Sequence, residues 1–244
     1  MSEFESTIAF GEPELMSVSA FKRYLAEAPR GLPDAGQSTR LATLNPTLME
    51  DLLRFEHGGR NADLLEVFAA CVRHARALTV HLQYRDKVLP LTIFPRQKVV
   101  HCPIDVSELA AGQPAELLVL DVETALLRPP GDAETALVGE GHLYAPLQPL
   151  LWVFALRGVR SELLPEVAGT AVYRVAPSFD VMLVPQGPLR DLLRHMRRNV
   201  LSLREIAAWP GLDADLATRV VNALYLQAAL MVSRSHPGAL NIPG

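Results

Sequence analysis

The chain has 244 residues, enough to bury one large hydrophobic core or two smaller ones. Hydrophobic residues make up 49% of it and charged residues 20%, which excludes a largely disordered protein. The net charge of −4 at pH 7 argues against a protein that coats nucleic acid non-specifically, but it does not exclude a local basic face.

The first part of the chain predicts three helices, over residues 17–28, 46–55 and 62–76. Pro46 stands at the first position of the second helix, where its missing amide hydrogen costs nothing. The third helix has the clearest helical period in this half. Its apolar stripe consists of Leu64, Leu65, Phe68, Cys71 and Val72.

Alternating apolar and polar residues then predict a sheet. Residues 78–84, 89–93 and 99–102 form three short strands joined by tight polar turns, which indicates an antiparallel meander. Residues 116–123 predict a fourth strand. Residues 128–132, with two prolines and a glycine between polar flanks, are the best candidate for a hinge.

Beyond the hinge, residues 143–156 predict a helix opened by Pro146 or Pro149, and residues 171–175 and 181–184 predict short strands. The helical stretch is the most apolar of the chain, but its prolines and its length exclude a membrane span.

Three features predict a cytoplasmic protein. The first six residues are acidic where a signal peptide would be basic, and no apolar segment follows them. Cys71 and Cys102 both lie in apolar contexts, and two cysteines make no disulfide framework. We therefore expect a reducing compartment and no membrane contact.

Residues 189–200 predict an amphipathic helix. Its inward side consists of Leu189, Leu192, Leu193 and Met196. Its outward side, the candidate surface for a partner, consists of Arg190, Arg194, Arg197 and Arg198. Such a stripe could meet an acidic partner, phosphate or only water.

Strong helix signals follow. Ser202 and Glu205 match a capping box, which opens a short helix. A Pro-Gly pair ends that helix, and Asp213 caps a longer one over residues 214–229. The inward stripe of the longer helix consists of Leu216, Val220, Leu224 and Ala228. Residues 230–234 predict an extended segment.

This order of elements, over residues 187–236, resembles the winged helix-turn-helix family. In that family the third helix reads the major groove of DNA. The resemblance implies that residues 214–229 form the reading helix. Its outward residues would include Asp215, Thr218, Arg219, Asn222 and Tyr225. The candidate nucleic-acid contacts are Thr218, Arg219, Asn222 and Arg234.

The charge distribution in this part favours protein contacts over DNA. Residues 187–234 hold seven arginines against four acids, but the expected reading helix carries a single arginine. The basic cluster lies on the first helix instead. DNA readers concentrate basic residues on the reading helix, because phosphate contacts supply most of the affinity.

The meander between Thr79 and Cys102 resembles, in its strand rhythm alone, the sheet of PatA N-terminal type domains of bacterial signalling proteins. We therefore expect an α+β protein of three parts. Residues 1–130 would form a helix-plus-meander domain, residues 131–186 a connecting helix and short strands, and residues 187–244 a winged-helix-like domain.

Motifs for catalysis and phosphate binding are absent from the sequence, including Gly-rich phosphate loops, Gly-x-Ser-x-Gly and His-Glu-x-x-His. Asp121 and Glu123 lie two apart on a predicted strand, hence on one face. No histidine, lysine or nucleophile is tied to them by sequence, so we expect an acidic strand edge and no catalytic residue.

Soft ligands do not converge either. Cys71 and His74 are three residues apart on one helix, whereas His101 and Cys102 are adjacent on a strand and point to opposite faces. We expect no metal and no cofactor.

The sequence predicts a non-enzymatic regulatory or signalling adaptor of bacterial type that acts through protein contacts. A DNA-binding transcriptional regulator with an N-terminal sensing domain is one alternative, and its binding would depend on salt. An enzyme of unrecognised type is the other, and a pocket lined by Asp121, Glu123 or His101 would be its first sign. The oligomeric state stays open.

Overall fold

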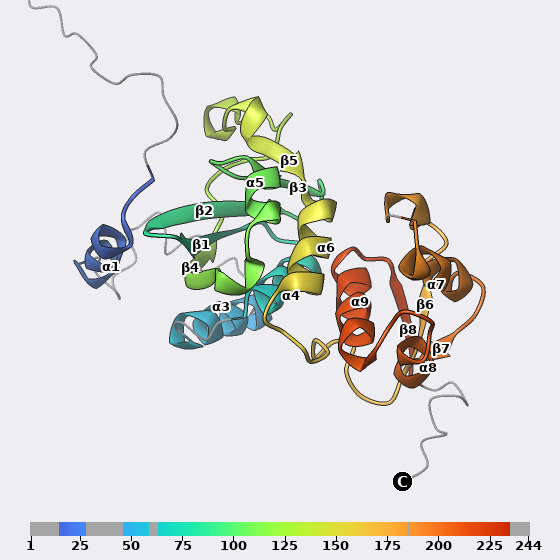
Figure 1. Ribbon diagram of the computed structural model, residues 1–244. Helices are drawn as coiled ribbons and strands as arrows, with labels where there is room; N and C mark the ends of the chain where they lie inside the picture. The colour runs from blue at the N-terminus through green and yellow to red at the C-terminus, as the bar shows by residue number, and fades with distance from the viewer. Residues whose placement is uncertain (1–14, 28–45, 59–62, 185, 235–244) are drawn as a thin grey trace, which may run out of the picture.

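The computed structural model describes residues 15–27, 46–58, 63–184 and 186–234 (Figure 1). Helices and antiparallel sheets are mixed along the chain, which confirms the α+β class. One sheet has five strands in the order β4-β1-β2-β3-β5, and the other has three in the order β7-β6-β8. Within these described ranges no helix is long and apolar enough to cross a membrane.

The five-stranded sheet contains the predicted meander. Its strands are β1 (Leu78–Tyr84), β2 (Lys87–Phe94), β3 (Val99–His101), β4 (Leu118–Thr124) and β5 (Tyr144–Pro146). The fourth strand pairs with β1, so it lies at the edge of the sheet. The prediction of a helix from residue 143 is wrong at its start. The helix begins at Leu147, and residues 144–146 form β5, which pairs with β3.

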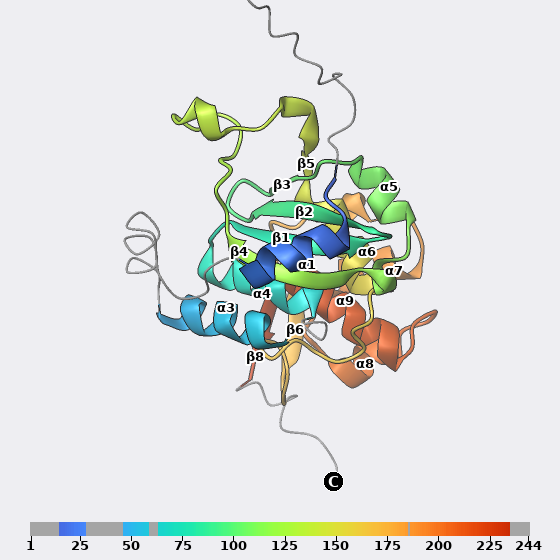
Figure 2. The ribbon, with the colours of Figure 1, turned by 90° about the vertical axis from the view of Figure 1, so that its left-hand side faces the viewer.

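Helices cover both faces of this sheet. α4 (Leu64–His74) and α6 (Leu147–Arg157) pack against the face whose strand residues are apolar. α1 (Val18–Glu27) lies across the opposite face (Figure 2). There its one buried residue, Phe21, packs against the ring of His81 in a tilted arrangement with 4.8 Å between centroids.

The N-terminal helices are present, with ends shifted from the predicted ones. Asp63 caps α4 by accepting a hydrogen bond from the Leu65 amide at 2.9 Å. α4 ends where Ala75 adopts a left-handed conformation with φ of 50°. α3 (Pro46–Gly58) begins at the predicted proline and continues three residues beyond the predicted end.

The second sheet is built around a strand that precedes its helices. Its strands are β6 (Val172–Val175), β7 (Leu201–Ser202) and β8 (Leu230–Ser233), and β6 lies between the other two. Its helices are α7 (Pro188–Met196), α8 (Leu203–Ala207) and α9 (Ala214–Leu226). The expected domain limit at residue 130 falls between β4 and β5 of the first sheet, and the limit at residue 186 falls between β6 and β7 of the second.

Local signals in this part are confirmed. Ser202 and Glu205 form the predicted capping box, with 2.7 Å between the Ser202 amide nitrogen and the Glu205 carboxylate. Asp213 caps α9 by accepting from the Leu216 amide at 2.8 Å. Residues 235 and 236, the last of the resemblance to winged helices, lie outside the described residues.

Short 3-10 turns complete the fold. They are η2 (Pro114–Glu116), η3 (Thr135–Leu137), η4 (Gly141–Leu143) and η5 (Val181–Leu183), with the short helix α5 (Val106–Ala111) preceding η2. η5 corrects the prediction of a strand at residues 181–184. Its cause is local, because the Asp180 carboxylate accepts a hydrogen bond from the Met182 amide at 2.9 Å and closes a turn there.

Candidate functional site

The predicted binding surface, the arginine-rich side of α7, is exposed only in part. Of the predicted inward side, Leu192, Leu193 and Met196 are fully buried, and Leu189 is half-buried. The prediction that Arg190 faces outward is wrong, because its side chain is buried. The guanidinium donates to the carbonyl oxygens of Val184 at 2.6 Å and Met182 at 3.3 Å. Arg190 therefore holds the end of η5 against α7.

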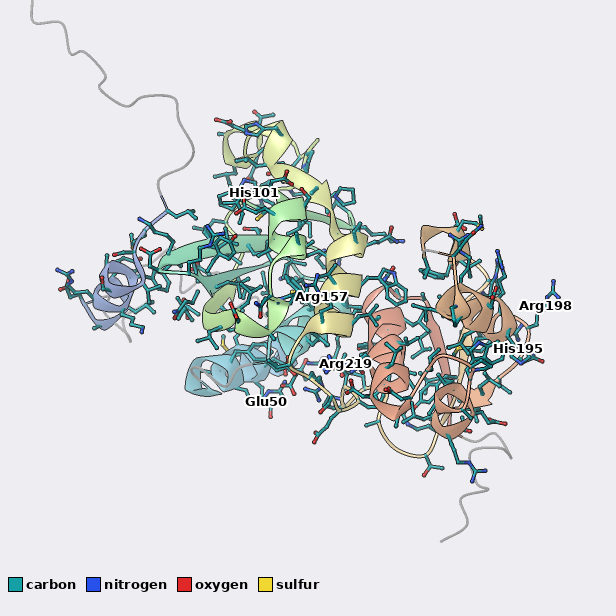
Figure 3. The ribbon with its side chains drawn as sticks, viewed as in Figure 1. Glu50, His101, Arg157, His195, Arg198 and Arg219 are labelled. Atoms are coloured by element: carbon teal, nitrogen blue, oxygen red, sulfur yellow. The ribbon has the colours of Figure 1, made fainter. Side chains whose placement is uncertain are left out.

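The other three predicted arginines differ in what they contact. Arg194 forms an ion pair with Asp191 at 2.9 Å, and both side chains are exposed. Arg197 is half-buried and donates to the Pro177 carbonyl at 2.8 Å. The Arg198 side chain makes no hydrogen bond or ion pair within the described ranges, and it projects away from the ribbon (Figure 3).

An aromatic pair that sequence reasoning missed stands beside these arginines. The rings of His195 and Trp209 lie 5.0 Å apart between centroids. His195 is exposed and Trp209 half-buried. We call Arg194, His195, Arg198 and Trp209 the arginine surface. Tryptophan and arginine are the residue types enriched where protein partners bind most strongly, so the tryptophan just before the Pro-Gly pair was the available signal.

α9, the expected reading helix, is covered on several sides. It packs against α6, α8 and α4, and its residues from Val220 to Leu224 are all buried (Figure 1). Asn222 and Thr218 were predicted to face outward, and both are buried. The Asn222 side chain accepts from the Leu164 amide and donates to the Glu162 carbonyl, each at 2.9 Å.

The two arginines proposed to contact nucleic acid hold the same connecting segment. Arg219 on α9 donates to Asp215 and to the Gly158 carbonyl, each at 2.7 Å, and lies between α9 and the segment after α6 (Figure 3). Arg234, which is exposed, donates to the Glu166 carbonyl at 2.8 Å. Both guanidiniums therefore bind residues 158–166 in this structure.

A charged cleft of about 390 Å³ lies where α3, α4 and that segment meet. Asp51 accepts from His74 at 2.8 Å and from Arg73, which also binds Glu166. Burial acts to raise the pKa of Asp51, but hydrogen bonds from His74 and Arg73 hold it below its ordinary value. Since Arg73 is held by acids on two sides, the cleft is an ionic junction between α3, α4 and the segment.

A histidine lies between the two predicted acidic residues. His81 Nδ1 lies 3.9 Å from Asp121, and His81 Nε2 lies 3.8 Å from Glu123. Burial lowers the pKa of His81 below its ordinary value, with Asp121 acting in the other direction. Burial and Asp121 together raise the pKa of Glu123. Asp121 and Glu123 also line a groove of about 700 Å³ between α3 and β4, which we call the edge groove.

Acidification is expected to destabilise the protein through His81. Because its pKa is lowered on folding, its contribution to stability is present above the ordinary histidine pKa of 6.5 and is lost as the pH falls through the folded-state pKa. The free energy of unfolding should fall more between neutral and mildly acidic pH for the wild type than for His81→Leu. Urea unfolding at both pH values measures this, and equal losses in the two proteins would contradict it.

Metal ligands do not converge among the described residues. Cys71 and Cys102 are both buried, and burial raises the pKa of Cys102 to about 11, so neither is poised as a thiolate. Comparison with known proteins adds no further assignment: the chain matches no family model, no curated protein and no solved structure.

Proposed function

We propose that this protein is a non-enzymatic regulatory or signalling adaptor of bacterial type, and that its arginine surface docks an acidic segment of a partner protein. The observation that carries the proposal is Arg198, an exposed guanidinium without an ion pair among the described residues, three residues after His195, whose ring lies 5.0 Å from that of Trp209. Arginine and tryptophan on one surface offer both charge and apolar area to a partner.

The state of α9 supports protein contacts over DNA as the target. A helix enters the major groove only when one of its sides is free. α9 is packed against α6 and α4, and Arg219 is held by Asp215 and the Gly158 carbonyl. The winged-helix resemblance is therefore proposed as a scaffold, and DNA reading by α9 would first require its separation from α6.

The enzyme alternative has one observation in its favour, because Asp121 and Glu123 line the edge groove. Against it, the histidine between them is covered by the Phe21 ring, and its ring nitrogens lie 3.9 and 3.8 Å from the two carboxylates, beyond hydrogen-bond distance. We therefore keep the adaptor as the proposed function.

Charge reversal on the arginine surface should weaken the binding of acidic peptides. A displayed peptide library selected on the wild-type protein is expected to yield acidic sequences, and Arg194→Glu with Arg198→Glu should weaken them at least about tenfold. Both side chains are exposed and neither holds the fold. Arg197 is left unchanged because it also binds the Pro177 carbonyl.

The matched control reverses two charges elsewhere, Arg85→Glu with Lys98→Glu, both on exposed turns of the first sheet. It should bind the selected peptides like the wild type. Selection of peptides without acidic residues, or equal binding by the arginine-surface variant, would overturn the proposal. A shift of duplex DNA at low salt that the same variant loses would favour the regulator instead.

A further inference from the structure

One segment joins the two edges of the first sheet. Residues 126–142, which we call the strap, connect β4 to β5, and these are the outermost strands of that sheet (Figure 2). Backbone hydrogen bonds fix both ends of the strap. The Ala125 amide donates to the Ala77 carbonyl at 3.2 Å, and the Leu143 carbonyl accepts from the Cys102 amide at 2.9 Å. The strap therefore spans the whole width of the sheet between two fixed points.

A histidine of β3 lies against the strap. The strand register places Thr92, His101 and Tyr144 in one row across β2, β3 and β5, so their side chains share one face of the sheet. The strap meets this row at Gly139, where an added Cβ would lie 2.8 Å from His101 Nε2. The Tyr144 hydroxyl holds the strap there, because it accepts from the Gly139 amide at 2.9 Å and donates to the Arg128 carbonyl at 2.6 Å.

The position of His101 suits only a neutral ring. The residue is 8% exposed, and neither ring nitrogen makes a hydrogen bond within the described ranges. The ring packs edge-on against that of Tyr144, with 5.0 Å between centroids. A protonated imidazole carries a charge and two N–H donors, and here both donors would lack an acceptor.

The charges around His101 give a proton on its ring no partner. Charged side chains of the strap are engaged with one another, since Glu140 pairs with His142, Glu134 pairs with Arg128, and Asp132 accepts from the Glu134 amide. On the sheet, the row of His101 continues through Thr79 to Glu123 of β4, which two strands separate from β3. Burial of the ring is therefore what lowers the pKa of His101 below its ordinary value.

The strap has internal contacts that let it move as a unit. The predicted hinge, residues 128–132, lies within it, and Gly131 there has a φ of 82°. The Arg128 amide donates to the Leu137 carbonyl at 2.8 Å, which closes the strap on itself. Between its two ends, the hydrogen bonds from the strap to the rest of the described chain are those of the Tyr144 hydroxyl. Few contacts therefore have to break for the strap to leave the sheet.

We propose that the strap is released by acid: the neutral His101 ring and the Tyr144 hydroxyl hold it on the sheet at neutral pH, and protonation of His101 detaches it. Residues 126–129 of the strap line the edge groove, so its release opens that groove. Neither this device nor the arginine surface depends on the other.

The direction of the pH dependence follows from the burial of His101. Its pKa is lowered while the strap is held and returns towards the ordinary value of 6.5 once the ring meets water. The held state is therefore fully favoured above pH 6.5. It loses stability relative to the released state as the pH falls through the lowered pKa of the held state.

Hydrogen exchange at the Gly139 amide measures release of the strap. Between pH 7.5 and 5.5 its protection, corrected for the intrinsic exchange rate, should fall by up to about tenfold, the limit for a ring with an ordinary pKa of 6.5 that stays neutral in the held state. Amides of β1 and β2 should stay far better protected than Gly139 at both pH values, because the sheet remains folded while the strap opens.

Substitutions separate the roles of charge and contact. His101→Leu removes the titrating ring and should make the protection of Gly139 equal at the two pH values, whereas His142→Gln, at an exposed position of the strap, should keep the wild-type response. Gly139→Ala places a methyl group against the imidazole and should lower protection at pH 7.5. Gly141→Ala is its matched control, since an added Cβ there meets nothing within 4 Å.

Nuclear magnetic resonance titration of the His101 ring tests the wild type without any substitution. The ring should titrate below pH 6.5, and titration at or above that value would overturn the proposal. Equal Gly139 protection at the two pH values would also overturn it, as would a wild-type response of His101→Leu. Loss of protection in β1 and β2 in step with Gly139 would assign the change to unfolding of the whole sheet and not to the strap.

Discussion

Replacement of Arg190 by glutamate is expected to lower the free energy of unfolding by about 3–5 kcal/mol, the cost of leaving a buried charge without its partner. The Arg190 side chain is buried on α7, and its donors hold the carbonyl oxygens of Val184 and Met182. A carboxylate in this position would face those carbonyl oxygens without any donor. Urea unfolding followed by circular dichroism measures the loss.

Arg194→Glu is the matched control, since it makes the same charge change one turn later on an exposed side chain. It breaks only the surface ion pair with Asp191, so its cost should stay below about 1 kcal/mol. A loss for Arg190→Glu no larger than for Arg194→Glu would mean that Arg190 is not buried in solution. Arg190 would then be added to the arginine surface as a binding residue.

The contrast between these two arginines shows what the sequence could supply and what it could not. Helical periodicity predicts α7 and its buried side, because period and apolar spacing are local properties. Arg190 lies at the margin of that side, and its burial depends on the turn of η5 closing over it. The sequence predicted a strand in place of that turn. The contact between Arg190 and the carbonyl oxygens of Met182 and Val184 was therefore not predicted.

The polar residues of α9 show the same limit of prediction from local sequence. Its start is predicted by Asp213, a local cap, and its burial on several sides arises from elements distant in sequence. Asn222 was placed outward because it is polar, yet it lies between Val221 and Ala223 in a run from Val220 to Leu230 without a charged residue. That absence of charge was the available sign of a helix buried on more than one side.

The edge groove required the topology of the sheet. The sequence predicts the four strands and places Asp121 and Glu123 on one face, as the structure confirms. It gives no indication that β4 pairs with β1 and leaves its other edge beside α3, because strand order depends on long-range contacts. The ionic junction of Asp51, Arg73 and Glu166 likewise joins three distant parts of the chain.

Asn222→Ala is expected to lower the free energy of unfolding by about 2–4 kcal/mol, because two polar groups are left without partners and each such loss costs about 1–3 kcal/mol. Asn222 is fully buried, and its amide satisfies both the Leu164 amide and the Glu162 carbonyl. Alanine keeps α9 helical and removes only those two bonds. Thr218→Ala removes a hydroxyl that donates to the Ala214 carbonyl of its own helix, and it should cost about 1 kcal/mol or less.

The same substitution tests the role of α9. Loss of the Asn222 bonds loosens the segment 158–166 from α9, and this segment also holds Arg219 through the Gly158 carbonyl. Electrostatic binding to DNA is strongest at low salt. If α9 were a DNA-reading helix masked by the segment, the Asn222→Ala variant should bind duplex DNA at low salt more tightly than the wild type does. We expect instead a less stable protein with unchanged DNA binding, because α9 carries too little positive charge to bind phosphates once it is released. Mobility shifts at low salt for the two proteins, beside their unfolding curves, distinguish a masked reading helix from a packing helix.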